Sequence, residues 1–235
     1  MDTQTRRALK GDKFAQAAAS GVTWFSGHRA GVQRAAIAAA VVVVLALGAV
    51  IYWNVENSAA AKALGAALDI YTAQLAEPGV PPASGTYATA ADRSKAANAA
   101  FMAAARKYGW LPEGMKARYF AGVTDEELGQ NASAESELKA AAGSWNHNLS
   151  NLAKLALAGL YQQTGRDAQA IEIYHALAAK PSETVSAAVA NLDLGDLYAA
   201  EGKQEQARMT WAKVRDMDKD GAAGSIAAQK LTGNQ

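Results

Sequence analysis

The sequence predicts an all-α protein in which one membrane-spanning helix is followed by a solenoid of stacked helix-turn-helix units. Three observations support this prediction. Residues 35–53 form an uncharged apolar run, the chain beyond residue 54 is rich in alanine without strand-like alternation, and three stretches of the C-terminal half repeat one another. Alanine is the best helix former, and a repeat of about 35 residues is typical of stacked helical pairs.

The apolar run AAIAAAVVVVLALGAVIYW is long enough to cross a bilayer. Its 19 residues extend about 28 Å as a helix, close to the ~30 Å hydrocarbon core. Arg29 and Arg34 precede it, and Tyr52 and Trp53 end it, which favours placement of both ends at the membrane interface. A signal peptide usually has an apolar stretch of about 7–15 residues, so we expect an uncleaved anchor. The small residues SAA at 58–60 leave cleavage open as the alternative.

Charge predicts the orientation of this helix. Residues 1–34 carry six Lys and Arg against two Asp, whereas the chain after residue 53 carries 17 Lys and Arg against 20 Asp and Glu. Basic residues near a span favour the cytoplasmic side. We therefore expect a basic cytoplasmic tail at 1–34, a transmembrane helix at 35–53 in the bacterial inner membrane, and a periplasmic domain from residue 54. The absence of cysteine excludes disulfides, and the net charge of +1 argues against a nucleic-acid partner.

A divergent helical pair with a proline-rich loop is expected at residues 54–114. The apolar stripe of its first helix consists of Leu64, Leu68, Tyr71 and Leu75. That helix must end at EPGVPPASG, because proline removes a backbone donor and clashes inside a helix. The second helix is expected from about Ala88 to Tyr108, and the stretch GWLP ends it.

Three repeated units are expected over residues 115–221. They align on Gly129, Gly165 and Gly202, which should each end the first helix of a pair with a positive φ. Each unit then has a small residue, a large residue and an apolar residue: Ala134, Ala170 and Ala207; Leu138, Tyr174 and Trp211; Ala141, Leu177 and Val214. The small residue allows close helix approach, and the large one fills the gap between units. Residues 222–235, with Ile226 and Leu231, are expected to be a capping helix and tail.

This pattern resembles the tetratricopeptide repeat, a helix-turn-helix unit of about 34 residues. The last unit, with LGDLY followed by Gly202, Ala207 and Trp211, matches it best. The middle unit has Ala158 where glycine is usual and Pro181 near the usual terminal proline, and the first unit is degenerate.

The whole arrangement of basic tail, single span and short repeat domain resembles the ancillary subunit of the bacterial Sec translocon. The resemblance implies a non-enzymatic, membrane-tethered interaction module ancillary to protein translocation and periplasmic chaperoning. Its partners would be translocon subunits, periplasmic chaperones or secreted clients, and residues 35–53 would contact the lipid bilayer. A scaffold for cell-envelope or cell-division machinery, built on the same repeats, is the alternative.

The resemblance also implies a site, because the first helices of such repeats line a concave groove for an extended or helical peptide. The residues expected to face this groove are Tyr119, Val123, Leu152, Leu155, Gln162, Val189, Leu192 and Asp196. Ordinary core is the alternative for the leucines. No catalytic, cofactor or metal site is expected, because the three histidines lack an HExxH motif or a cysteine partner, and no GxSxG or glycine-rich phosphate loop occurs.

Overall fold

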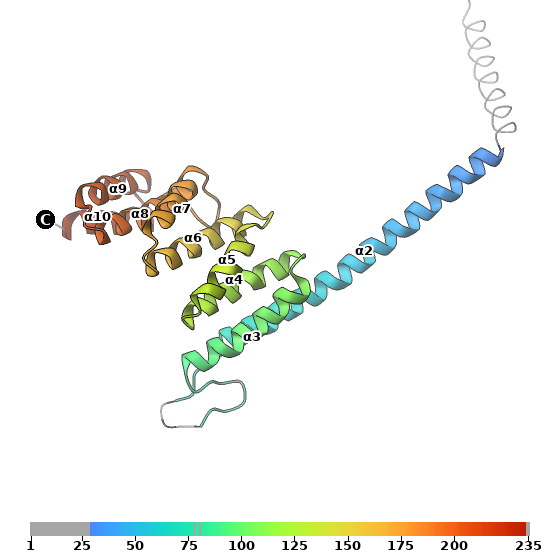
Figure 1. The fold of residues 1–235 in the computed structure, drawn as a ribbon, viewed down its shortest axis with the longest axis horizontal. Coiled ribbons are helices and arrows are strands. Elements are labelled where there is room, and N and C mark those ends of the chain that lie inside the picture. Colours follow the sequence, from blue (N-terminus) through green and yellow to red (C-terminus); the bar gives the residue numbers. More distant parts are fainter. Residues whose placement is uncertain (1–28, 78, 80, 234–235) are drawn as a thin grey trace, which may run out of the picture. The chain divides into compact units, whose positions relative to one another are not determined.

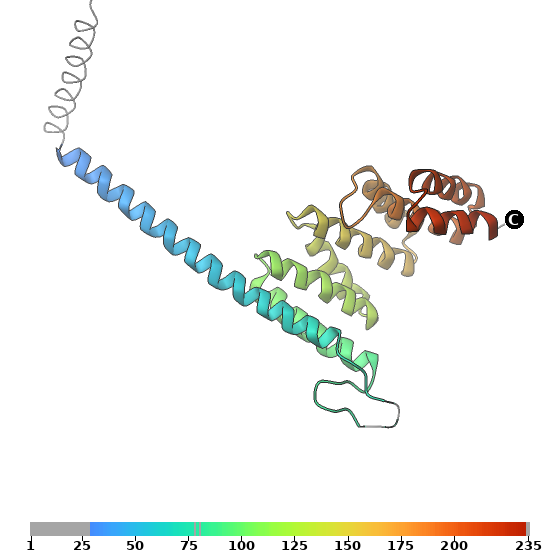
Figure 2. The ribbon, with the colours of Figure 1, turned by 180° about the vertical axis from the view of Figure 1, so that it is seen from behind.

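The computed structural model of the chain describes residues 29–77, 79 and 81–233, and it confirms the all-α fold. Figure 1 shows the succession of helices, and Figure 2 shows them from behind. The helices are α2 (Arg29–Tyr71), α3 (Ala90–Tyr108), α4 (Pro112–Glu127), α5 (Asn131–Ala142), α6 (His147–Gln163), α7 (Asp167–Ala179), α8 (Ala187–Ala200), α9 (Gln204–Met217) and α10 (Ala222–Gly233). Most of the expected basic tail, residues 1–28, and the final residues 234–235 lie outside the described residues.

The apolar run is part of one continuous helix, α2, of 43 residues. No proline interrupts the sequence between residues 29 and 77, so nothing forces a break after the apolar stretch. The chain divides into two compact units within this helix, one up to Val55 and one from Glu56 onward. The expected boundaries between the tail, the span and the first helical pair therefore fall inside one helix.

The helix α2 ends at Tyr71, earlier than the prolines require. The next residues pair with the far side of the loop, where the Ala76 N–H donates to the Tyr87 carbonyl at 2.8 Å and the Tyr87 N–H donates to the Gln74 carbonyl at 3.2 Å. Leu75 lies in this isolated bridge and is exposed, so the prediction that it continues the helical stripe is wrong. Pairing across the loop satisfies the backbone groups that a helix would otherwise satisfy.

The helix α3 begins at Ala90, where the Thr89 hydroxyl caps the helix by accepting from the Asp92 N–H at 3.0 Å. It lies beside the last turns of α2 in both views (Figures 1 and 2). Phe101 stacks on Phe120 of α4, with ring centroids 5.2 Å apart. The shared core of α2, α3 and α4 comprises Leu64, Ala67, Ala97, Phe101, Ala104, Ala105, Ala117 and Ala121.

The pairs α4/α5, α6/α7 and α8/α9 lie where the three repeated units are expected. Gly129, Gly165 and Gly202 end the first helices with φ of 72°, 71° and 76°, which confirms the predicted left-handed turns. After each glycine, the next backbone N–H returns to the last turn of the helix; Gln130 donates to the Asp125 carbonyl at 2.8 Å, for example. This is the Schellman hydrogen bond, which satisfies a carbonyl that the helix leaves open.

Within two of the pairs, the large residue of the second helix packs directly on a glycine of the first. A Cβ built on Gly122 would lie 2.6 Å from Leu138 Cγ, and one built on Gly195 would lie 2.7 Å from Trp211 Cδ1. Both distances are shorter than carbon atoms can approach. The middle pair has Ala158 at this position, in the same buried cluster as the large residue Tyr174.

The helix α10, in the segment expected to form a capping helix, packs against the last pair. Ala223 and Ala227 are buried against Trp211, and Leu231 is partly buried beside them. Ile226 is instead 42% exposed, because the buried face of the helix is centred on Ala223, Gly224 and Ala227. Ile226 therefore points away from the core, whereas Leu231, of equal size, packs against it.

Candidate interaction surface

The first helices of the three pairs carry all eight residues that we expect to face a partner. We call the surface formed by residues 116–127 of α4, 152–163 of α6 and 189–200 of α8 the first-helix face. Residues at equal places in the three helices differ by 36 and then 37 positions, as the repeat glycines do. Tyr119 thus corresponds to Leu155 and Leu192.

The leucines of this face contribute mainly to packing. Leu192 is buried in the cluster that contains Trp211 and Val214. Leu152 and Leu155 are half-buried against the cluster of Leu177, Val185 and Ala190. Val123 and Val189 are also half-buried. Little of Leu192 is therefore left to contact a partner, whereas the other five apolar or aromatic positions, Tyr119 included, keep part of their surface exposed.

The predicted polar residues link neighbouring helices. Asp196 Oδ1 accepts from the Trp211 indole N–H at 2.9 Å, and Asp196 Oδ2 lies 3.0 Å from Lys230 Nζ, so this side chain joins α8 to α9 and α10. The Tyr174 hydroxyl donates to Gln162 Oε1 at 3.5 Å. Burial, together with the carboxylate of Glu126, raises the pKa of Tyr119.

Two further carboxylates lie on the first-helix face and were not anticipated. Burial raises the pKa of Asp193 to about 6, an effect strengthened by Asp196 and opposed by Lys230. Burial also raises the pKa of Glu126, although Oε1 of Glu126 accepts from Gln163 Nε2 at 2.6 Å. Comparison of repeat positions would have identified Asp193, because α4 has a phenylalanine and α6 an alanine at the same place.

A hollow of about 570 Å³ opens between the C-terminal parts of α6 and α8, and we call it the α6–α8 hollow. Leu197, which is buried, contributes its apolar base. A Cβ added at Gly159 would meet nothing within 4 Å, so the hollow is open at this residue. Its lining consists of Gly159, Gln162, Gln163, Asp167, Leu197, Ala200 and Glu201.

A second hollow, of about 510 Å³, lies among α7, α8 and α9. Lys213 Nζ donates across it to Asn191 Oδ1 at 3.2 Å, and His175 Nε2 lies 3.4 Å from the Tyr198 hydroxyl oxygen. Four of its polar side chains therefore lie close together in two pairs. Met209 at its edge is 61% exposed.

The histidines do not form a reactive constellation in the described part of the chain. His147 begins α6, His175 faces Tyr198 on α8, and His28 lies outside the described residues. Over residues 29–77, 79 and 81–233, no three His, Cys, Asp or Glu side chains are grouped so that they could hold a metal ion. The groups that the first-helix face presents are carboxylates, amides and half-buried apolar side chains.

The N-terminal part of α2 presents a different surface. Every residue from 33 to 55 is exposed, including the run of four valines. Within the described residues, one helix is long and apolar enough to cross a membrane, over Gln33–Tyr71. A signal sequence near an N-terminus also passes this test of length and apolarity.

Comparison with known proteins agrees with the repeat pattern. The family model described as a tetratricopeptide repeat-like domain matches residues 32–233. No curated protein and no solved structure matches the chain. The match includes the three helical pairs, the pair formed by α2 and α3, and the capping helix. Such domains are typically non-catalytic modules for protein–protein interaction, and the chain belongs to the tetratricopeptide repeat-like domain family.

Proposed function

We propose that the protein is a membrane-tethered module that binds other proteins at the periplasmic face of the bacterial inner membrane. The observation that carries this proposal is the direct succession, within α2, of an exposed apolar segment and a repeat domain. The exposed apolar surface of residues 33–55 is unfavourable in water and is typical of a segment that a bilayer or a partner covers. A lipid bilayer matches both its length and its lack of charge.

The continuity of α2 supports an uncleaved anchor rather than a signal peptide. The small residues at 58–60 lie inside the helix, and Ala60 is buried against Tyr108 and Leu111. Cleavage there would remove the start of the segment that packs on α3. The excess of basic residues before the apolar run supports a cytoplasmic N-terminus and a periplasmic repeat domain.

The role that we propose is ancillary to protein translocation and periplasmic chaperoning. A repeat domain held at the outer surface of the inner membrane is placed where translocated chains emerge. Its first-helix face offers half-buried apolar groups beside carboxylates and amides, which suits transient contact with unfolded segments. A scaffold for cell-envelope or cell-division proteins would use the same face with other partners.

Site-specific photocrosslinking in living cells tests this function. A photoreactive amino acid replaces Val123 on the first-helix face or, as the control, the exposed Met209 on α9. We expect crosslinks from Val123 to translocon subunits, periplasmic chaperones or secreted chains, and fewer from Met209. Crosslinks from Val123 to division or cell-wall proteins without the translocon would support the scaffold instead, and equal yields from both positions would refute binding at this face.

Protease protection tests the membrane topology separately. Protease added to intact spheroplasts should digest residues 56–235 and spare only the membrane-embedded and cytoplasmic residues. A C-terminal tag that stays protected until the membrane is disrupted would place the repeat domain in the cytoplasm and overturn the proposed orientation.

A further inference from the structure

The α6–α8 hollow is open because one repeat position lacks a side chain. Gly159 stands where α4 has Val123 and α8 has Asp196. Nothing lies within 4 Å of a Cβ at Gly159, and the hollow of about 570 Å³ falls within the ~300–1,000 Å³ range of ligand pockets. The first-helix face therefore has room here for a side chain from another molecule.

The charged groups of the hollow are of one sign. Asp167 and Glu201 line it, and no lysine or arginine does so among the described residues. The carboxylate of Glu126 borders it through its hydrogen bond with Gln163. Asp193 lies one helical turn before the base of the hollow on α8.

The protein's own cations compensate only part of this charge. Lys203 Nζ lies 3.1 Å from Glu201 Oε2, which neutralises one lining carboxylate. Within the described residues, no ion pair reaches Glu126, Asp167 or Asp193. The raised pKa of Asp193 has the same origin, since its carboxylate is desolvated near another carboxylate. A cation arriving from outside would relieve this repulsion.

We propose that the α6–α8 hollow receives a lysine or arginine side chain from an extended, positively charged segment of a partner protein. This inference rests on the proposed function, because it assumes that the first-helix face binds polypeptide. The alkyl stem of the incoming residue would lie along Leu197 and Ala200, and its charged end would donate charge-assisted hydrogen bonds to the carboxylates. An acidic segment would meet like charge, and a neutral one would leave the carboxylates uncompensated.

Peptide titration tests the inference on the full-length protein in non-ionic detergent. The probes are two fluorescein-labelled peptides of about twelve residues, one with three lysines and one with glutamines in their place, and empty micelles give the background. We expect the lysine peptide to bind at least about tenfold more tightly by fluorescence anisotropy. Its affinity should fall as salt rises from about 0.05 to 0.5 M, because salt screens exposed charges.

Matched variants locate the binding. Gly159→Trp fills the hollow, and the double variant Asp167→Asn with Asp193→Asn removes charge without changing shape. Met209→Trp places the same indole on the exposed surface of α9, and Glu172→Gln removes an exposed charge from α7. We expect the first two proteins to lose at least about tenfold in affinity for the lysine peptide and the two controls to stay within about twofold. Circular dichroism checks the folding of every variant, and Gly159→Gln replaces the tryptophan variant if that one unfolds.

The possible results separate the inference from the proposed function. Equal binding of the two peptides, abolished by Gly159→Trp, would overturn the preference for a cation and leave a polypeptide-binding face. Affinity that the hollow variants do not change would overturn the assignment of the site. Binding of neither peptide would also overturn the inference, and the crosslinks from Val123 would then decide the proposed function independently.

Discussion

Replacement of Trp211 by alanine should strongly destabilise the C-terminal repeat. The indole ring is 2% exposed and packs on Gly195, where even a Cβ would collide with it. Removal of a buried Trp or Phe side chain costs about 3–5 kcal/mol, and the cost is largest where the site cannot collapse. The alanines of α10 opposite the ring have short side chains that cannot fill the space. We therefore expect the upper part of this range.

The lost hydrogen bond should add little to this cost. Asp196 would no longer accept from the indole N–H, but it would keep its ion pair with Lys230, and its side chain is 38% exposed. Solvent and the remaining partner limit the additional loss to about 1 kcal/mol. Trp211→Phe, which keeps most of the ring packing and lacks the donor, should therefore be much less destabilised than Trp211→Ala.

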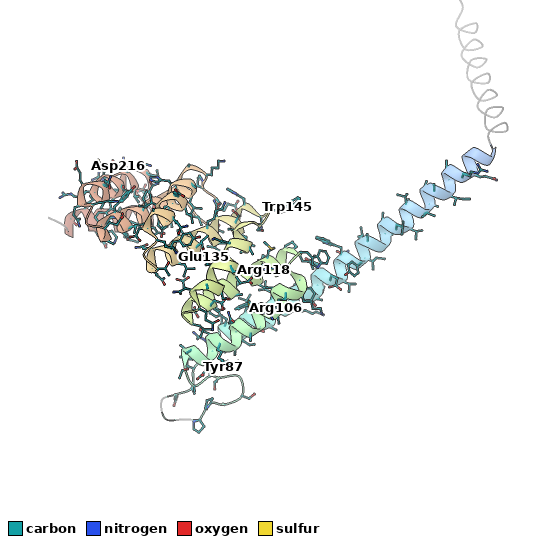
Figure 3. All side chains as sticks on the ribbon, viewed as in Figure 1. Tyr87, Arg106, Arg118, Glu135, Trp145 and Asp216 are labelled. Carbon is teal, nitrogen blue, oxygen red and sulfur yellow. The ribbon has the colours of Figure 1, made fainter. Side chains whose placement is uncertain are left out.

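Urea denaturation of the full-length protein in non-ionic detergent, followed by circular dichroism, measures these differences. Trp145→Ala is the matched control, because this tryptophan is fully exposed at the turn between α5 and α6 and points away from the helices (Figure 3). Its transition should shift by less than about 0.5 kcal/mol. The unfolding of α8, α9 and α10 can separate from that of the other pairs, since repeats contact mainly their neighbours.

Equal transitions for Trp211→Ala and Trp145→Ala would refute the reasoning. Such a result would mean that the packing of a large residue on a small one does not hold the last pair together. A loss confined to the transition of the last pair would instead agree with the predicted packing.

Three further predictions concern packing and pH. Gly195→Ala should destabilise the protein by about 1–3 kcal/mol in thermal denaturation, because its Cβ would lie 2.7 Å from Trp211 Cδ1. Because folding raises the pKa of Asp193 from its ordinary 3.8 to about 6, the folded chain binds more protons between these values, and its stability should fall as pH rises through them. Asp193→Asn should flatten the pH profile of stability between 3.8 and about 6 and raise the unfolding midpoint at pH 7. An unchanged profile would contradict the raised pKa of Asp193. Glu135 behaves oppositely, since hydrogen bonds, first from Lys139 and also from an arginine, lower its pKa to about 2. Its stabilisation is fully present above the ordinary value of 4.5 and is lost as pH falls through about 2. The substitution Glu135→Gln should therefore cost about 0.5–1 kcal/mol at pH 7 and progressively less as the pH falls below 4.5.

The sequence predicted the repeat pairs because their determinants are local. A glycine at Gly129, Gly165 or Gly202 ends a helix through its own backbone freedom, whatever surrounds it. The small and large residues that follow at fixed intervals come together because an α-helix has a fixed number of residues per turn. The length and apolarity of residues 35–53 are likewise properties of the chain itself.

Features that depend on distant residues were less predictable. Leu75 fits a helical stripe, but the backbone of the proline-rich loop pairs across to Tyr87 and removes it from the helix. The sequence also places Glu135 on a helix but does not predict which residues it contacts. Figure 3 shows Glu135 on α5, and its carboxylate forms an ion pair with Arg166 of the next unit. Contacts between units depend on how the pairs stack, which no local pattern specifies.

The glycines at positions 159 and 195 show where sequence information ends. Both lie inside first helices, and the repeat register places only Gly195 where glycine is usual, with Gly159 one position further along its own unit. The tertiary structure decides that Gly195 is closed against the ring of Trp211, whereas Gly159 opens into the hollow beside α8. The sequence alone determined the all-α class, the apolar segment and the register of the repeats, because these follow from the chain's local geometry. The tertiary structure decided that the carboxylate of Asp193 is desolvated and that Gly159 lies at an open hollow. Both properties depend on which faces of α6 and α8 the neighbouring helices cover.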